Sequence, residues 1–115
     1  MRSLFWIGDS LTRLKDFPEA VRVEMGFALY TAQAGGNADN TKPLKGLDSG
    51  VFEIVSSFDG DAYRAVYTVK LKKGIYVLHA FQKKSKHGIA TPRPDMELIR
   101  QRLAKARQMD QEDSQ

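Results

Sequence analysis

The stretch DAYRAVYTVKLKKGIYVLHAFQKK, residues 61–84, contains two apolar runs that are joined by a short turn of lysine and glycine. Both runs are rich in valine and aromatic residues, which favour β-strands. A third run of this kind, VFEIVSSF at residues 51–58, precedes them and is separated only by a turn at 59–61. Because such short connections join antiparallel neighbours, the three runs predict an antiparallel meander.

The chain before this meander predicts one short strand and two helices. Residues 3–8, SLFWIG, have the composition of a strand, and a short helix is expected to start at Asp9 or Ser10. Apolar residues recur at helical spacing between 18 and 34, which predicts the main helix of this half. Glycine, asparagine and proline in 35–43 predict a loop.

The C-terminal region predicts one further helix, with Thr91 as N-cap and Pro92 at the first helical position. Its polar end, residues 108–115, is expected to fray. Together these elements predict an α+β fold, in which a small antiparallel β-sheet is packed by an N-terminal helical pair and followed by a C-terminal helix. At this length we expect a single domain over residues 1–115.

The composition excludes several classes of protein. The chain has no cysteine, which rules out disulfides and thiolate metal sites and suits a reducing compartment. No segment approaches the roughly 20 apolar residues of a membrane span, and the first residues do not form a signal peptide. We therefore expect a cytoplasmic protein.

Positive charge is concentrated in one part of the chain. Residues 1–60 contain six Lys/Arg and eight Asp/Glu, whereas residues 61–107 contain twelve Lys/Arg and only three Asp/Glu. This excess favours a polyanionic partner, because each lysine or arginine that meets a phosphate releases condensed counterions. A solvated basic face is the alternative interpretation.

Arg64 stands inside an apolar run, where an unpaired charge would be costly. Two interpretations remain open: an ion pair with Glu53 across adjacent strands, or a guanidinium that is held to grip a phosphate. Strict strand alternation places Arg64 and Val66 on one face of their strand. In the next strand it places four residues on one face, namely Ile75, Val77, His79 and Phe81.

His79 can be a core histidine or a participant in catalysis, and Phe81 can be a core residue or a platform for a base. The two histidines of the chain lack any further ligand pattern, so no metal site is expected. Arginine, lysine, histidine and tyrosine on a sheet suit RNA cleavage that uses the 2′-hydroxyl, which requires proton transfer and cations but no metal.

Several short elements add a family resemblance: KGL at 45–47, FEI at 52–54, YR with Tyr67, LHAFQKKS at 78–85 and GIATP at 88–92. Through them the second half of the chain resembles the phage-derived, HigB-like branch of the RelE/ParE toxin superfamily. The resemblance implies a toxin of a type II toxin–antitoxin system that acts as a metal-independent, ribosome-dependent endonuclease (mRNA interferase). The implied partners are messenger RNA, the ribosome and a helix-turn-helix antitoxin, without a cofactor or a membrane.

The resemblance also implies roles for individual residues. Arg64 matches the arginine that contacts the scissile phosphate, and the lysines after Phe81 match a second cationic position. The expected catalytic residues are Arg64, His79, Lys84 and Tyr67, and the expected RNA-binding residues are Lys83, Phe81 and Lys86. The chain departs from the family pattern because it lacks a histidine or tyrosine near the C-terminus, so His79 and Tyr67 remain the candidates for proton transfer.

Two other function classes stay open at this level. A ParE-like toxin that is directed at gyrase would share the fold and act by protein binding. A non-catalytic basic module would use the same positive charge only to bind.

Overall fold

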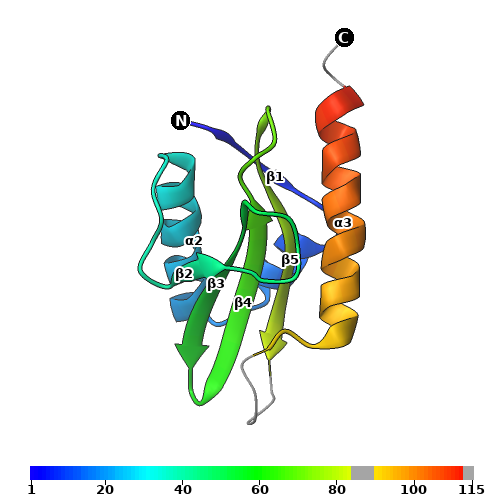
Figure 1. The fold of residues 1–115 in the computed structure, drawn as a ribbon. Coiled ribbons are helices and arrows are strands. Elements are labelled where there is room, and N and C mark those ends of the chain that lie inside the picture. The colour runs from blue at the N-terminus through cyan, green and yellow to red at the C-terminus, as the bar shows by residue number, and fades with distance from the viewer. Residues whose placement is uncertain (84–89, 113–115) are drawn as a thin grey trace.

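The computed structural model describes residues 1–83 and 90–112 (Figure 1). Its elements are, in order, β1 (Ser3–Trp6), α1 (Ser10–Lys15), α2 (Glu19–Gln33), β2 (Thr41–Pro43), β3 (Val51–Phe58), β4 (Asp61–Thr68), β5 (Gly74–Lys83) and α3 (Arg93–Glu112). The predicted α+β fold is confirmed, with two N-terminal helices, a mostly antiparallel sheet and a C-terminal helix.

Five strands form one sheet in the order β1-β5-β4-β3-β2. The meander of β3, β4 and β5 is antiparallel, as its short turns predict. β1 joins the sheet at the other edge of β5 and runs parallel to it. Gly74 makes this pairing possible, because a Cβ at that position would collide with the carbonyl oxygen of Ser3.

The two long helices lie on opposite faces of the sheet (Figure 1). The apolar stripe of α2 packs against one face, around Met25, Ile54 and Ala65. The seam of α3 packs against the other face, around Ile99, Val66 and Leu78. One face of the sheet is therefore covered by α2 together with Leu14 of α1, and the other face by α3. Within the described ranges no helix is long and apolar enough to cross a membrane.

Residues 41–43 were expected to be part of a loop, but they form the short edge strand β2. Thr41 pairs with Ile54 and Pro43 pairs with Phe52 of β3. A three-residue strand is too short to show an alternating pattern, so only its hydrogen bonds to β3 define it.

The expectation of a frayed end from residue 108 is wrong for residues 108–112, because α3 continues to Glu112. Asp110 explains the ordered end. Its buried carboxylate accepts hydrogen bonds from the backbone N–H groups of Lys72 and Lys73, both at 2.8 Å, and from the Tyr76 hydroxyl at 3.2 Å. This carboxylate ties the last turn of α3 to the turn between β4 and β5. Residues 113–115 lie outside the described range.

These contacts predict a pH-dependent contribution of Asp110 to stability. Burial raises the pKa of the carboxyl, but the hydrogen bonds from Lys72, Lys73 and Tyr76 outweigh it, so the pKa lies below its usual value. A carboxyl with a depressed pKa in the folded state stabilises the fold at neutral pH, and this contribution is lost as the pH falls below about 4. We expect Asp110→Asn to lower the free energy of unfolding at pH 7 by about 1–3 kcal/mol.

Urea titrations at pH 7 and in the acid range measure this difference, with Glu112→Gln on the exposed side of the same turn as the control. The difference between Asp110→Asn and the wild type should shrink in acid. A constant difference at all pH values would contradict the assignment.

Candidate functional site

A β-bulge decides which side chains of β5 meet at the candidate site. The pairing of β4 with β5 shifts between Val66 and Tyr67, whose partners are His79 and Val77. Ile75 and Val77 therefore face α2, whereas His79 and Phe81 face α3. The strict alternation that placed these four residues on one face is wrong, because a bulge adds one residue to the strand.

Glu53 of β3 is the polar centre of the α3 face. Its side chain is only 1% exposed, and Arg64 Nη1 donates to its Oε1 at 2.7 Å. Arg64 is itself buried. Of the two interpretations of Arg64, the structure shows the ion pair with Glu53. Because an unpaired buried charge is very costly, each of these residues requires the other.

Other polar groups surround the same carboxylate. Lys42 Nζ lies 3.9 Å from Oε1, and its side chain is about half exposed. The Thr91 hydroxyl donates to Oε2 at 3.2 Å. This contact differs from the expected N-cap role of Thr91, since α3 starts only at Arg93.

Lys83 belongs to the same group of charges. Burial lowers the pKa of its ammonium, the positive charges of Arg64 and Lys42 lower it further, and the carboxylate of Glu53 opposes them. Three cations thus act on one carboxylate, so this part of the α3 face carries an excess of positive charge. We call Lys42, Glu53, Arg64 and Lys83 the Glu53 cluster.

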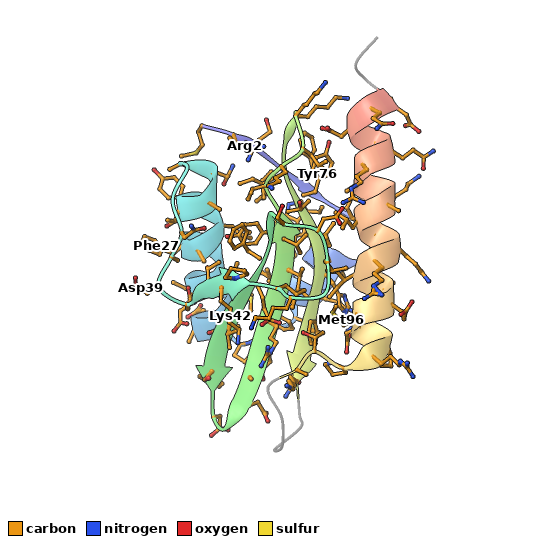
Figure 2. The ribbon with its side chains drawn as sticks, viewed as in Figure 1. Arg2, Phe27, Asp39, Lys42, Tyr76 and Met96 are labelled. Atoms are coloured by element: carbon orange, nitrogen blue, oxygen red, sulfur yellow. The ribbon has the colours of Figure 1, made fainter. Side chains whose placement is uncertain are left out.

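A pocket of about 460 Å³ opens beside the Glu53 cluster. Figure 2 labels two residues that line this pocket, Lys42 on β2 and Met96 on α3. The described residues that line the pocket come from β2, the segment after it, β3, the approach to α3 and α3 itself; they are Lys42, Pro43, Leu44, Lys45, Glu53, Ala90, Thr91 and Met96. Apolar walls with two lysines and one carboxylate suit a ligand that combines a flat apolar part with negative charge.

His79 lies on the same face but is engaged within the fold. Its Nε2–H donates to Asp95 Oδ1 at 2.7 Å, and its Nδ1 accepts from Arg102 Nη1 at 3.5 Å. Burial lowers the pKa of the imidazole, Asp95 raises it, and the charge of Arg102 lowers it. The ring also stacks on Phe81, with centroids 4.9 Å apart. In this arrangement His79 links β5 to α3, and Phe81 is a core residue.

Tyr67 is separated from the other predicted site residues. It is fully buried on the α2 face, where it stacks near Phe52 with ring centroids 5.8 Å apart. Burial raises the pKa of its phenol. The structure thus brings Arg64 and Lys83 together, with His79 and Phe81 on the same face, while Lys84 and Lys86 lie outside the described residues.

The sequence interpretation missed the contribution of Lys42, Lys45 and Thr91 to this site. The sequence did contain one signal for these contacts. Glu53 is a charged residue in an apolar strand, and a buried carboxylate requires more than one polar partner. No three His, Asp or Glu side chains gather as metal ligands would in the part of the chain that the structure describes.

The Glu53–Arg64 pair predicts strong coupling in stability. Removing one charge leaves the other buried and unpaired, so Glu53→Leu and Arg64→Met should each cost about 3–5 kcal/mol. The double variant should cost less than the sum of the two, because it removes both charges together. Urea denaturation of the four proteins measures the coupling. Additive costs would show that the two charges do not depend on each other.

Comparison with known proteins places the chain in a family. Residues 12–104 match the family described as Phage derived protein Gp49-like (DUF891), a match that includes β3, β4, β5 and most of α3. Among curated proteins none matches the sequence. The matched range spans most of the chain and includes all four members of the Glu53 cluster. The chain therefore belongs to the Gp49-like family, a family of RelE/HigB-like toxins.

Proposed function

We propose that this protein is the HigB-like toxin of a type II toxin–antitoxin system and cleaves messenger RNA on the ribosome without a metal. The observation that carries the proposal is the Glu53 cluster, where Lys42, Arg64 and Lys83 surround one carboxylate beside an open pocket. Membership of a toxin family supports the same function.

The cations provide the first requirement of RNA cleavage, which is stabilisation of negative charge on the phosphate. Lys42 is the residue best placed for this role. Its contact with Glu53 is long at 3.9 Å and its side chain is half exposed, so the ammonium can turn to a phosphate without leaving a buried charge unpaired. Lys45 on the same pocket wall offers a second contact.

The carboxylate of Glu53 provides the second requirement, a group that accepts the proton of the attacking 2′-hydroxyl. It forms part of the pocket wall, whereas His79 and Tyr67 do not. Arg64 and Thr91 each hold one oxygen of this carboxylate and thereby fix its orientation. In this proposal Arg64 is a positioning residue that acts through Glu53, rather than a direct phosphate contact.

Attack by the 2′-oxygen breaks the bond from phosphorus to the 5′-oxygen, and this leaving oxygen takes its proton from water. The ribosome supplies in-line placement of the 2′-hydroxyl and the scissile phosphate. This dependence fits a site in which two exposed lysines are the accessible groups and the carboxylate of Glu53 lies almost fully buried in the pocket wall. A toxin of this kind acts in the cytoplasm and requires a neutralising partner, for which a helix-turn-helix antitoxin remains our proposal.

Lys42→Ala tests the proposal directly. We expect it to relieve the growth arrest that follows induction of the wild-type protein, and to reduce transcript cleavage by about 10²-fold, because a preorganised charge at the phosphate is lost. Mapping of transcript 5′ ends after a short induction measures the cleavage. Because Lys42 is exposed, its loss should leave the thermal midpoint unchanged.

Lys105→Ala, on the exposed surface of α3, is the matched control and should remain fully toxic. Full toxicity and unchanged cleavage by Lys42→Ala would remove the Glu53 cluster from the mechanism. Growth arrest with intact transcripts and inhibited DNA supercoiling would instead identify a gyrase-directed toxin.

A further inference from the structure

The outer face of α2 is apolar, although it points away from the sheet. Val23, Phe27 and Tyr30 are 66%, 67% and 56% exposed. Figure 2 shows Phe27 on the outer side of this helix. The three residues follow one another at spacings of four and three, so they form one continuous stripe. A helix that is apolar on both sides is typical of a buried helix, so this stripe indicates a partner.

Gly26 lies within the same stripe and gives it a notch. A glycine in the interior of a helix weakens it relative to alanine. Nothing in the described chain requires a glycine here, because a Cβ at Gly26 would meet no atom within 4 Å. The φ angle of Gly26 is not positive, so its backbone conformation does not require a glycine either. A small residue on an exposed helix face allows the backbone of a second helix to approach closely.

The stripe is complementary to itself. If a second α2 crosses antiparallel about a two-fold axis between Gly26 and Phe27, the ring of each Phe27 lies over the notch at Gly26 of the other copy. Val23 then lies opposite Tyr30 in both directions. This is the knob-into-hole arrangement of packed helices, with the same patch used twice, as a two-fold interface requires.

The charges beside the stripe also fit an antiparallel pair. Glu19 and Arg22 are exposed near the start of α2. An antiparallel crossing separates the two copies of each residue, whereas a parallel crossing would bring like charges together. α3 lies on the opposite face of the sheet from α2 (Figure 1). Because the pocket is lined by Met96 of α3, it would remain accessible in such a pair.

We propose that the protein forms a two-fold homodimer through the outer faces of α2, with Phe27 of each copy seated over Gly26 of the other. One helix pair buries less area than a standard interface of about 1,600 Å². We therefore expect a weak dimer, with Kd on the order of 10 μM. This proposal does not depend on the function of the Glu53 cluster.

Sedimentation velocity tests the dimer on the full chain, made by cell-free synthesis. The protein concentration is varied from about 1 to 200 μM, a range that brackets this Kd. The wild type should move from the monomer mass toward twice that value. Phe27→Ser and Gly26→Ala should each weaken association at least tenfold. Gly26→Ala should also raise the thermal midpoint, because alanine favours the helix and has room in the monomer, so loss of the dimer cannot reflect unfolding.

Phe58→Ser is the matched control, since Phe58 is another exposed aromatic residue, at the end of β3. It should leave association unchanged. A wild type that stays monomeric over the whole range would overturn the proposal, as would a dimer that Phe27→Ser leaves intact. If this face binds only a helix of another protein, the chain alone will stay monomeric in this experiment.

Cross-linking tests the antiparallel register, because the chain has no cysteine of its own. Val23→Cys and Tyr30→Cys should form a disulfide efficiently when the two variants are mixed, and each should cross-link poorly alone. Stronger cross-linking of Val23→Cys with itself would contradict the antiparallel crossing.

Discussion

The buried carboxylate of Glu53 is the constraint around which the α3 face is organised. A charge in the middle of a sheet is tolerated only if other groups neutralise it and satisfy its oxygens. Arg64 meets this need from the neighbouring strand, and Lys42 and Thr91 meet it from the edge strand and the approach to α3. Three segments that are distant in sequence therefore converge on one side chain, and the pocket lies between them.

The position of α3 determines the shape of that pocket, and polar contacts near both ends and in the middle hold this helix beyond its apolar seam. Asp95 accepts from His79 near the start of the helix, and Asp110 accepts from the turn between β4 and β5 near its end. In the middle, Arg102 contacts the carbonyl oxygen of Leu78 at 3.0 Å and the carboxylate of Asp9 at 2.6 Å. His79 thus contributes to the site by fixing the helix that carries Met96, rather than by facing a ligand.

The surfaces beside α3 and on the outer side of α2 differ in chemical character. The α3 side combines cations with a pocket, which suits a polyanion, whereas the outer face of α2 is apolar and suits a second helix. Because the sheet separates these surfaces, binding at one leaves the other accessible.

All the strands except β2, and the two long helices, could be predicted from the sequence, because period-two and helical patterns are local and each of these elements buries a regular face. Arg64 could be selected as a candidate for a local reason, since its charge interrupts an otherwise apolar strand, whereas Lys83 was selected through the family resemblance. The sequence left open whether Arg64 pairs with Glu53 or binds phosphate, and it could not reveal the contribution of Lys42 or Thr91 to the same cluster.

Only the tertiary structure decided these points, because they depend on contacts between distant segments. The bulge that turns His79 toward α3 follows from the pairing of β4 with β5, and β2 exists only through its hydrogen bonds to β3. The order of the last turn of α3 likewise depends on Asp110 reaching the backbone of Lys72 and Lys73. Local propensity specifies which elements form, whereas strand register and buried charge determine which side chains share a site.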